Sequence, residues 1–236
     1  MKYILTLSAL ASAVLAHGGV TGYKFGSTYV KGFTPYNDAS KQKTIQRQWS
    51  TFNPIEQPNS PSMACNTPGT LAAESQSVAA GSQVQAQWNN GYSHDIGPIV
   101  VWMTECPSHA CTPSAAKWFK IDESGLLSGT LPKGNWASGK MIKANYTWTF
   151  DIPKALKAGD YLLRTESIAM HSTAPQFYME CAQLKVTGSG MATPPANYRA
   201  SIPGVYALSD PAWSQPVWAR QQETSFKVPG PSVWKA

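Results

Sequence analysis

Residues 176–181 read QFYMEC and begin a predicted strand that extends to residue 186. Alternate side chains of a strand lie on the same face, so Gln176 and Tyr178 are expected on one face. Phe177, Met179 and Cys181 are expected on the other face, toward the core. Apolar residues at positions 184 and 186 have the same parity as Tyr178. This parity predicts either a bulge or a face that becomes buried beyond Tyr178.

Other short runs of strand-forming residues recur between clusters of Gly, Pro, Asn and Ser. They are residues 84–88, 99–103, 118–121, 146–150 and 161–168. Short strands separated by turn residues are typical of all-β sandwiches and barrels. No helical periodicity extends over ten or more residues after residue 16. The sequence therefore predicts an all-β fold.

Two long Pro-rich segments, residues 33–68 and 188–236, show little alternation and are predicted to be loops. Loops of this length in a compact domain are usually functional. The first segment carries Tyr36, Trp49 and Phe52. Their rings are expected either to form a flat stacking surface for carbohydrate or to cap the ends of the sandwich, and the sequence favours neither.

The composition excludes several classes of protein. The chain has 236 residues, a formal net charge of +6, and 14% charged against 42% apolar residues. Its length predicts one domain, or at most two. The low charge and nine Trp exclude disorder, while 18 Gly and 18 Pro exclude a coiled coil. The basic residues are dispersed, so no nucleic-acid partner is expected.

Residues 1–16, MKYILTLSALASAVLA, have the features of a secretory signal peptide. A Lys precedes an apolar stretch, and small residues close it before a cleavage site after Ala16. The stretch is too short for a membrane anchor, and no other segment approaches a membrane span. Cleavage leaves residues 17–236 as one secreted, extracellular domain of 220 residues with a net charge of +5. It also gives His17 a free α-amino group.

Secretion makes disulfides the expected state of the four cysteines. Four cysteines allow three connectivities, and the sequence does not choose among them. Proximity favours Cys106 with Cys111, which leaves Cys65 with Cys181. Asn145 begins the only N-x-S/T sequon that lacks proline and is the expected glycosylation site.

An N-terminal histidine is a natural bidentate metal ligand, because its amine and ring Nδ1 close a six-membered chelate. His17 and His94 together offer three nitrogen donors, a set that suits Cu(II). Tyr178 could add an axial oxygen. His171 and Gln176 could hydrogen-bond a bound oxygen species. These residues come from three separate segments, and the hypothesis depends on all three.

Motifs of other enzyme classes are missing from the sequence. It contains neither HExxH nor G-x-S-x-G. Six carboxylates could in principle supply the acid and base of a glycosidase. Most of them are expected in turns or on solvated strand faces. They are Asp122, Glu123, Asp151, Asp160, Glu166 and Glu180.

Taken together, these features resemble those of the lytic polysaccharide monooxygenases of auxiliary activity family nine, once classed as glycoside hydrolase family sixty-one. The matching pieces extend over residues 17–236. They are the cleavage site before His17-Gly18, His94 with the GP at 97–98, WFKID at 118–122, GDYLLR at 159–164, His171 leading to QFYMECAQL at 176–184, and IPGVY at 202–206. Residues 33–68 match poorly, and the chain ends without a terminal cysteine. The first departure leaves the substrate preference open.

The resemblance implies an immunoglobulin- or fibronectin-like β-sandwich whose long loops form a flat, copper-bearing face. It implies that His17 and His94 bind one copper ion as a histidine brace with Tyr178 as the axial ligand. His171 and Gln176 would orient oxygen or peroxide beside this catalytic centre, and Tyr206 would stack on a sugar ring.

The implied reaction is the oxidative cleavage of a β-1,4-glucan, either cellulose or a hemicellulose, with an external electron donor and O₂ or H₂O₂. The chain is expected to act as a monomer without a separate carbohydrate-binding module. Three alternatives stay open: a non-catalytic secreted copper-binding protein of the same fold, a carbohydrate-binding module without a metal, and a glycosidase.

Overall fold

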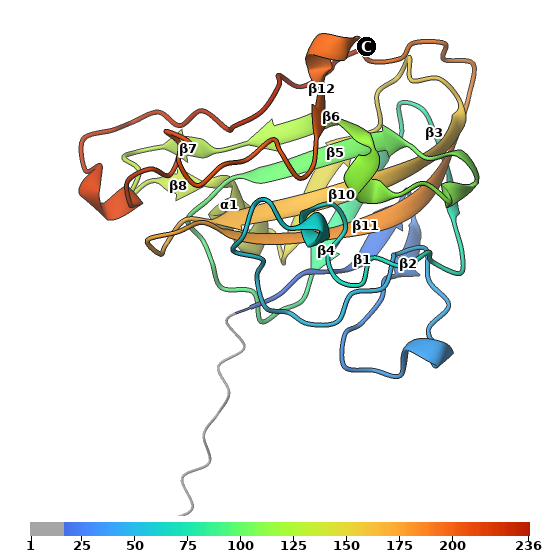
Figure 1. The fold of residues 1–236 in the computed structure, drawn as a ribbon, viewed down its shortest axis with the longest axis horizontal. Coiled ribbons are helices and arrows are strands. Elements are labelled where there is room, and N and C mark those ends of the chain that lie inside the picture. The colour runs from blue at the N-terminus through green and yellow to red at the C-terminus, as the bar shows by residue number, and fades with distance from the viewer. Residues whose placement is uncertain (1–16) are drawn as a thin grey trace, which may run out of the picture.

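The computed structural model describes residues 17–236, and the predicted signal peptide, residues 1–16, lies outside the described residues. Two β-sheets account for most of the regular structure (Figure 1). In spatial order, the four-stranded sheet contains β2 (Thr28–Lys31), β1 (Val20–Phe25), β4 (Gln83–Trp88) and β9 (Thr147–Asp151). The six-stranded sheet contains β12 (Arg199–Ser201), β6 (Lys117–Ser124), β5 (Ile99–Glu105), β10 (Gly159–Ala169), β11 (Gln176–Thr187) and β3 (Gln76–Ala79).

The remaining elements are short. A small hairpin pairs β7 (Leu126–Ser128) with β8 (Asn135–Trp136), and α1 (Ala137–Lys143) follows it. Short 3₁₀ turns lie in the connections: η1 (Ala39–Lys41), η2 (Pro61–Met63), η3 (Pro107–His109), η4 (Pro113–Ala115), η5 (Ala196–Tyr198) and η6 (Val217–Ala219). No helix within residues 17–236 is long and apolar enough to cross a membrane.

The first hydrophobic core lies between the two sheets. The alternation of β4 places Val84, Ala86 and Trp88 in this core, and β9 adds Trp148 and Phe150 from the neighbouring strand. These residues face the larger sheet, so the predicted β-sandwich is confirmed. Strand β6 is longer than predicted and continues to Ser124, with a register shift opposite it between Val101 and Trp102 of β5.

A second hydrophobic core covers the outer face of the six-stranded sheet. Phe177, Met179 and Cys181 of β11 pack there, against residues of the two long loops rather than against the smaller sheet. In Figure 1 the C-terminal segment, orange to red, runs along this sheet. Strand β11 is therefore buried on both faces. The Tyr178 face also lies in a core, together with Leu184 and Val186, which is the second of the two outcomes that their parity allowed.

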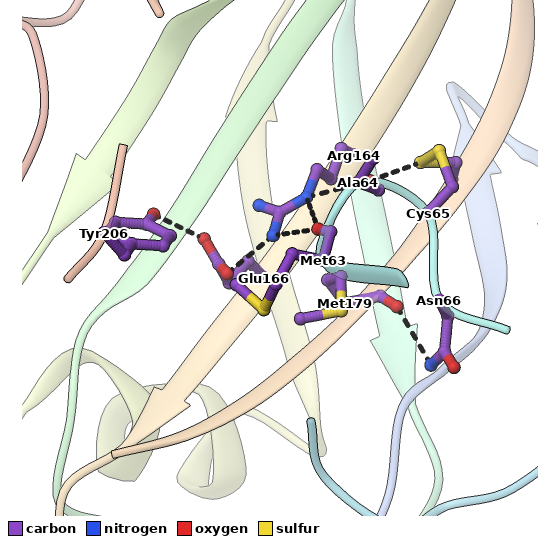
Figure 2. A network of polar contacts seen from close by, with 9 residues as sticks. Met63, Ala64, Cys65, Asn66, Arg164, Glu166, Met179 and Tyr206 are labelled. Carbon is purple, nitrogen blue, oxygen red and sulfur yellow. Dashed lines mark hydrogen bonds and ion pairs between the residues drawn. A yellow bond between two sulfur atoms is a disulfide. The ribbon is translucent and has the colours of Figure 1, made fainter. Parts of the chain in front are cut away.

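A buried ion-pair network fastens the first long loop to the sheet (Figure 2). The Arg164 guanidinium donates to Glu166 Oε1 at 2.7 Å, to the Met63 carbonyl at 2.9 and 3.1 Å, and to the Ala64 carbonyl at 3.0 Å. Both charged side chains are fully buried. Of the six carboxylates, most of which were expected in solvent, Glu166 and Glu180 are buried, because each lies on a strand buried on both faces.

Two disulfides cross-link the chain. Cys65 pairs with Cys181, which ties the first long loop to β11, and Cys106 pairs with Cys111. The connectivity favoured by proximity is confirmed. Within the described residues no cysteine is free.

The prediction that Tyr206 stacks on a sugar is wrong. Its side chain is only 4% exposed. The ring stacks on Phe177, with centroids 5.3 Å apart, and the hydroxyl donates to Glu166 Oε2 at 2.7 Å. Tyr206 belongs to the second core, because the C-terminal loop needs apolar groups to bury against the sheet.

We predict that Glu166→Ala destabilises the fold by about 3–5 kcal/mol, because it leaves the Arg164 guanidinium buried without its counter-ion. Urea unfolding of the variant and the parent chain measures the difference. Glu223→Ala is the matched control, since Glu223 pairs with Arg220 at the surface and its removal is expected to change little. If the free energy of unfolding falls by the same small amount in both variants, the buried network does not stabilise the fold as proposed.

Candidate metal centre

Three rings from distant parts of the chain meet at one end of the sandwich. His17 lies just before β1, His94 lies in the loop between β4 and β5, and Tyr178 lies on β11. The ring centroid of His17 is 5.8 Å from that of His94 and 6.0 Å from that of Tyr178. His94 and Tyr178 are 5.4 Å apart by the same measure. The structure therefore brings together the three residues that the sequence singled out as metal ligands.

Two consecutive glycines let the chain reach this position. A Cβ atom on Gly18 would collide with the Asn89 side chain and would lie 2.9 Å from Tyr92 Cβ. A Cβ atom on Gly19 would collide with the Glu180 carboxyl and would lie 2.7 Å from the Trp49 ring. The segment after His17 thus passes through a slot that only glycine fits.

His94 is held with one ring nitrogen facing Tyr178. Its Nε2 lies 3.0 Å from the Tyr178 hydroxyl, and the ring of Tyr92 packs edge-on against it at 5.2 Å. Burial, reinforced by the nearby His171 and His17, lowers the pKa of His94 to about 4. The imidazole is therefore neutral at ordinary pH, which is the form that binds metals.

His171 and Gln176 flank these rings. The ring of His171 stacks on His94 with centroids 4.2 Å apart and an interplanar angle of 9°. Burial and, less strongly, His17 lower the pKa of His171, while Asp95 acts in the opposite direction. Gln176 Oε1 accepts a hydrogen bond from the Tyr178 hydroxyl at 3.0 Å.

The first long loop contributes two polar side chains that sequence reasoning missed. Ile55 and Phe177 exchange two backbone hydrogen bonds of 2.9 Å, which fix the loop beside the start of β11. Glu56 then accepts a bond of 3.4 Å from Gln176 Nε2, and Asn53 Oδ1 lies 3.1 Å from His17 Nδ1. No motif signals these contacts, because they depend on where the loop crosses the strand.

The carboxyl of Glu180 lies beside the backbone that leads from His17 into β1. Its Oε2 accepts a 2.8 Å hydrogen bond from the Val20 backbone N–H at the start of β1. Burial raises the pKa of Glu180 to about 8, although the Val20 bond and Arg164 act against the rise. Burial also raises the pKa of the Tyr178 phenol, with smaller contributions from Tyr92 and Glu56.

The residues present fit a copper ion by the chemistry of their donors. Two imidazoles and a phenol face one another, and the amine that cleavage before His17 is expected to free would add a third nitrogen to a set that suits Cu(II). Among residues 17–236 no group of three or more His, Cys, Asp and Glu side chains is arranged to hold a metal. A centre of this kind would depend on the backbone nitrogen of His17 as well as on side-chain donors.

The fourth histidine and other residues that the sequence singled out lie elsewhere. The side chain of His109 is 12% exposed, and its Nε2 lies 3.0 Å from the Leu184 carbonyl, outside the centre. Asn145 is exposed at the end of α1, so glycosylation there stays a prediction. The loop aromatics divide between the two expected roles: Trp49 is buried, whereas Tyr36 is 72% exposed.

Comparison with known proteins gives one consistent result. The model of Auxiliary Activity family 9, formerly GH61, matches residues 17–226. The AA9 family lytic polysaccharide monooxygenase B of Heterobasidion irregulare is 46% identical over 98% of this chain and 97% of its own length. The AA9 family lytic polysaccharide monooxygenase D of Thermothelomyces thermophilus is 40% identical over 98% of this chain and 93% of its own.

Solved structures agree with the sequence comparison. The crystal structure of HiLPMO9B superimposes with a TM-score of 0.89 at 46% identity, covering 93% of this chain and all of that one. A cellulose-active polysaccharide monooxygenase from M. thermophila gives a TM-score of 0.86 at 40% identity, over 93% of this chain and 99% of that one.

Proposed function

The chain belongs to auxiliary activity family 9, and from that premise we propose that His17, His94 and Tyr178 hold a single copper ion. Like its relatives, the chain is an oxidoreductase that cleaves polysaccharides oxidatively. We propose cellulose or a related β-1,4-glucan as the substrate. The convergence of the three rings at centroid distances of 5.4–6.0 Å is the observation that carries the copper assignment.

Bound there, copper would supply the redox chemistry of the oxidative cleavage, with electrons from an external donor and O₂ or H₂O₂ as the oxidant. The chain provides the metal ligands. His17 supplies its amine and ring nitrogen once residues 1–16 have been removed. His94 supplies a neutral imidazole, and Tyr178 turns its hydroxyl toward it at 3.0 Å.

His171 and Gln176 act beside the ligands as hydrogen-bonding groups. Stacking on His94 holds the exposed His171 ring at the edge of the centre. The Tyr178 hydroxyl and the Glu56 carboxylate fix both ends of the Gln176 amide. A non-catalytic copper-binding protein needs no such pair, so their presence favours the enzyme.

Substrate contact is assigned to Tyr36 in place of Tyr206. The Tyr36 hydroxyl lies 2.9 Å from Thr51 Oγ1, and its ring lies 5.9 Å from that of Phe52. Its backbone is in the left-handed region, with φ of 70°, which is uncommon for a bulky residue. A ring that is exposed yet fixed in this way is suited to stack on a sugar.

We further propose that the protein is secreted, that residues 17–236 form one catalytic domain, and that it works as a monomer. The signal-like sequence of residues 1–16 and the family match from residue 17 support this assignment.

The proposed function is tested with protein that carries a native His17 N-terminus. Incubated with copper, a reductant and cellulose, it is expected to release oxidised oligosaccharides detectable by mass spectrometry. The same protein stripped of copper by a chelator is expected to release none. Release of unmodified reducing ends that is independent of copper and reductant contradicts the proposal and favours a glycosidase.

For the substrate contact, we predict that Tyr36→Ala weakens binding to cellulose about 3- to 10-fold, since an aromatic stacking contact contributes about 0.5–1.5 kcal/mol. A pull-down isotherm measures the change. Tyr29→Ala is the matched control, because Tyr29 is 54% exposed on the edge strand β2. If both variants bind like the parent chain, Tyr36 has no role in substrate contact.

A further inference from the structure

We propose that Asn89 is a positioning residue that holds His17 in place for copper binding. This inference rests on the proposed function. Asn89 directly follows β4, and its side chain lies against the backbone of the segment that leads from His17 into β1.

The pairing of β1 with β4 ends where this contact begins. The last register pair is Val20 with Trp88, and the Asn89 backbone N–H then donates to the Gly19 carbonyl at 3.1 Å. Beyond that point the side chain continues the ladder. Its Oδ1 accepts from the Gly19 N–H at 2.9 Å, and its Nδ2 donates to the His17 carbonyl at 3.4 Å.

The orientation of the Asn89 amide follows from the groups it faces. The Gly19 N–H can only donate, so it requires the oxygen of the amide. The nitrogen is thereby turned to the His17 carbonyl, which can only accept. A single side chain thus binds both ends of the backbone unit that spans Gly18.

This contact compensates for the freedom of the two glycines. Gly18 and Gly19 are required by the narrow slot, but glycine loses more conformational freedom on ordering than any other residue. The hydrogen bond to the His17 carbonyl restrains the position of the His17 Cα atom. The amine and the side chain of His17 are both attached to that atom. Both nitrogen donors are therefore held beside His94 in the metal-free protein.

On the opposite side of the slot, Glu180 accepts from the Val20 N–H and Trp49 packs against Gly19. These contacts hold the start of β1 but do not reach His17. Asn53 reaches the His17 ring through Nδ1, the nitrogen that the copper assignment requires. The Asn89 contact, by contrast, restrains His17 through its backbone carbonyl and uses none of its proposed metal donors.

The test compares Asn89→Ala with Asn90→Ala. Asn90 is the neighbouring residue, and its side chain is exposed. Loss of a partner that orients a metal ligand lowers metal affinity about 10- to 100-fold. We expect a loss of this size in Cu(II) affinity for Asn89→Ala by calorimetry, with Asn90→Ala unchanged. In the metal-free protein, Asn89→Ala is also expected to speed hydrogen exchange at the Gly19 amide.

Asn89→Asp covers the case in which the alanine variant does not fold. It keeps the acceptor for Gly19 and removes the donor to His17, while its added negative charge by itself favours a cation. A fall in Cu(II) affinity therefore supports the role of the His17 contact. Unchanged affinity in folded Asn89→Ala, or undiminished affinity in Asn89→Asp, overturns it. If the parent chain itself binds no copper, the proposed function fails instead.

Discussion

Strand β11 is buried on both faces, and this constraint decides where the rest of the molecule lies. One face packs into the core between the sheets and presents Tyr178 at its open end. The other face carries Phe177, Met179 and Cys181 and has to be covered by something other than the smaller sheet. The two long loops cover it. They are held there by apolar packing, by the Cys65–Cys181 disulfide and by the Arg164–Glu166 pair.

The same covering builds the surroundings of the metal centre. Because Ile55 pairs with Phe177 through two backbone hydrogen bonds, the first loop crosses β11 directly beside Gln176. Glu56 and Asn53 then reach Gln176 and His17. The second core and the centre are therefore coupled: a loop that packed differently against the sheet would take these polar contacts away from the site.

Sequence reasoning succeeded where side-chain periodicity or donor chemistry carries the information. Alternation predicted β4 and offered burial of Leu184 on the Tyr178 face as one of two outcomes, and the chemistry of an N-terminal histidine pointed to His94 and Tyr178 as its neighbours. It failed where the outcome depends on loop packing. Tyr206 was expected at the surface but fills the second core. Glu166 belongs to a set of carboxylates most of which were expected in solvent, but it faces a buried guanidinium. Asn89 and Glu56 could not be recognised, because nothing local distinguishes an asparagine in a turn or a glutamate in a loop from one that contacts a ligand.

The central claim is that the third nitrogen of the copper site is the free amine of His17. Calorimetric titration with Cu(II) of two forms of the chain, one beginning at His17 and one with a single alanine before it, tests this claim most directly. We predict that the extra residue lowers the Cu(II) affinity by more than about 100-fold, the upper end of the loss caused by removing an outer partner of a ligand. The fold is expected to be unchanged by circular dichroism. Equal affinity in the two forms would contradict it.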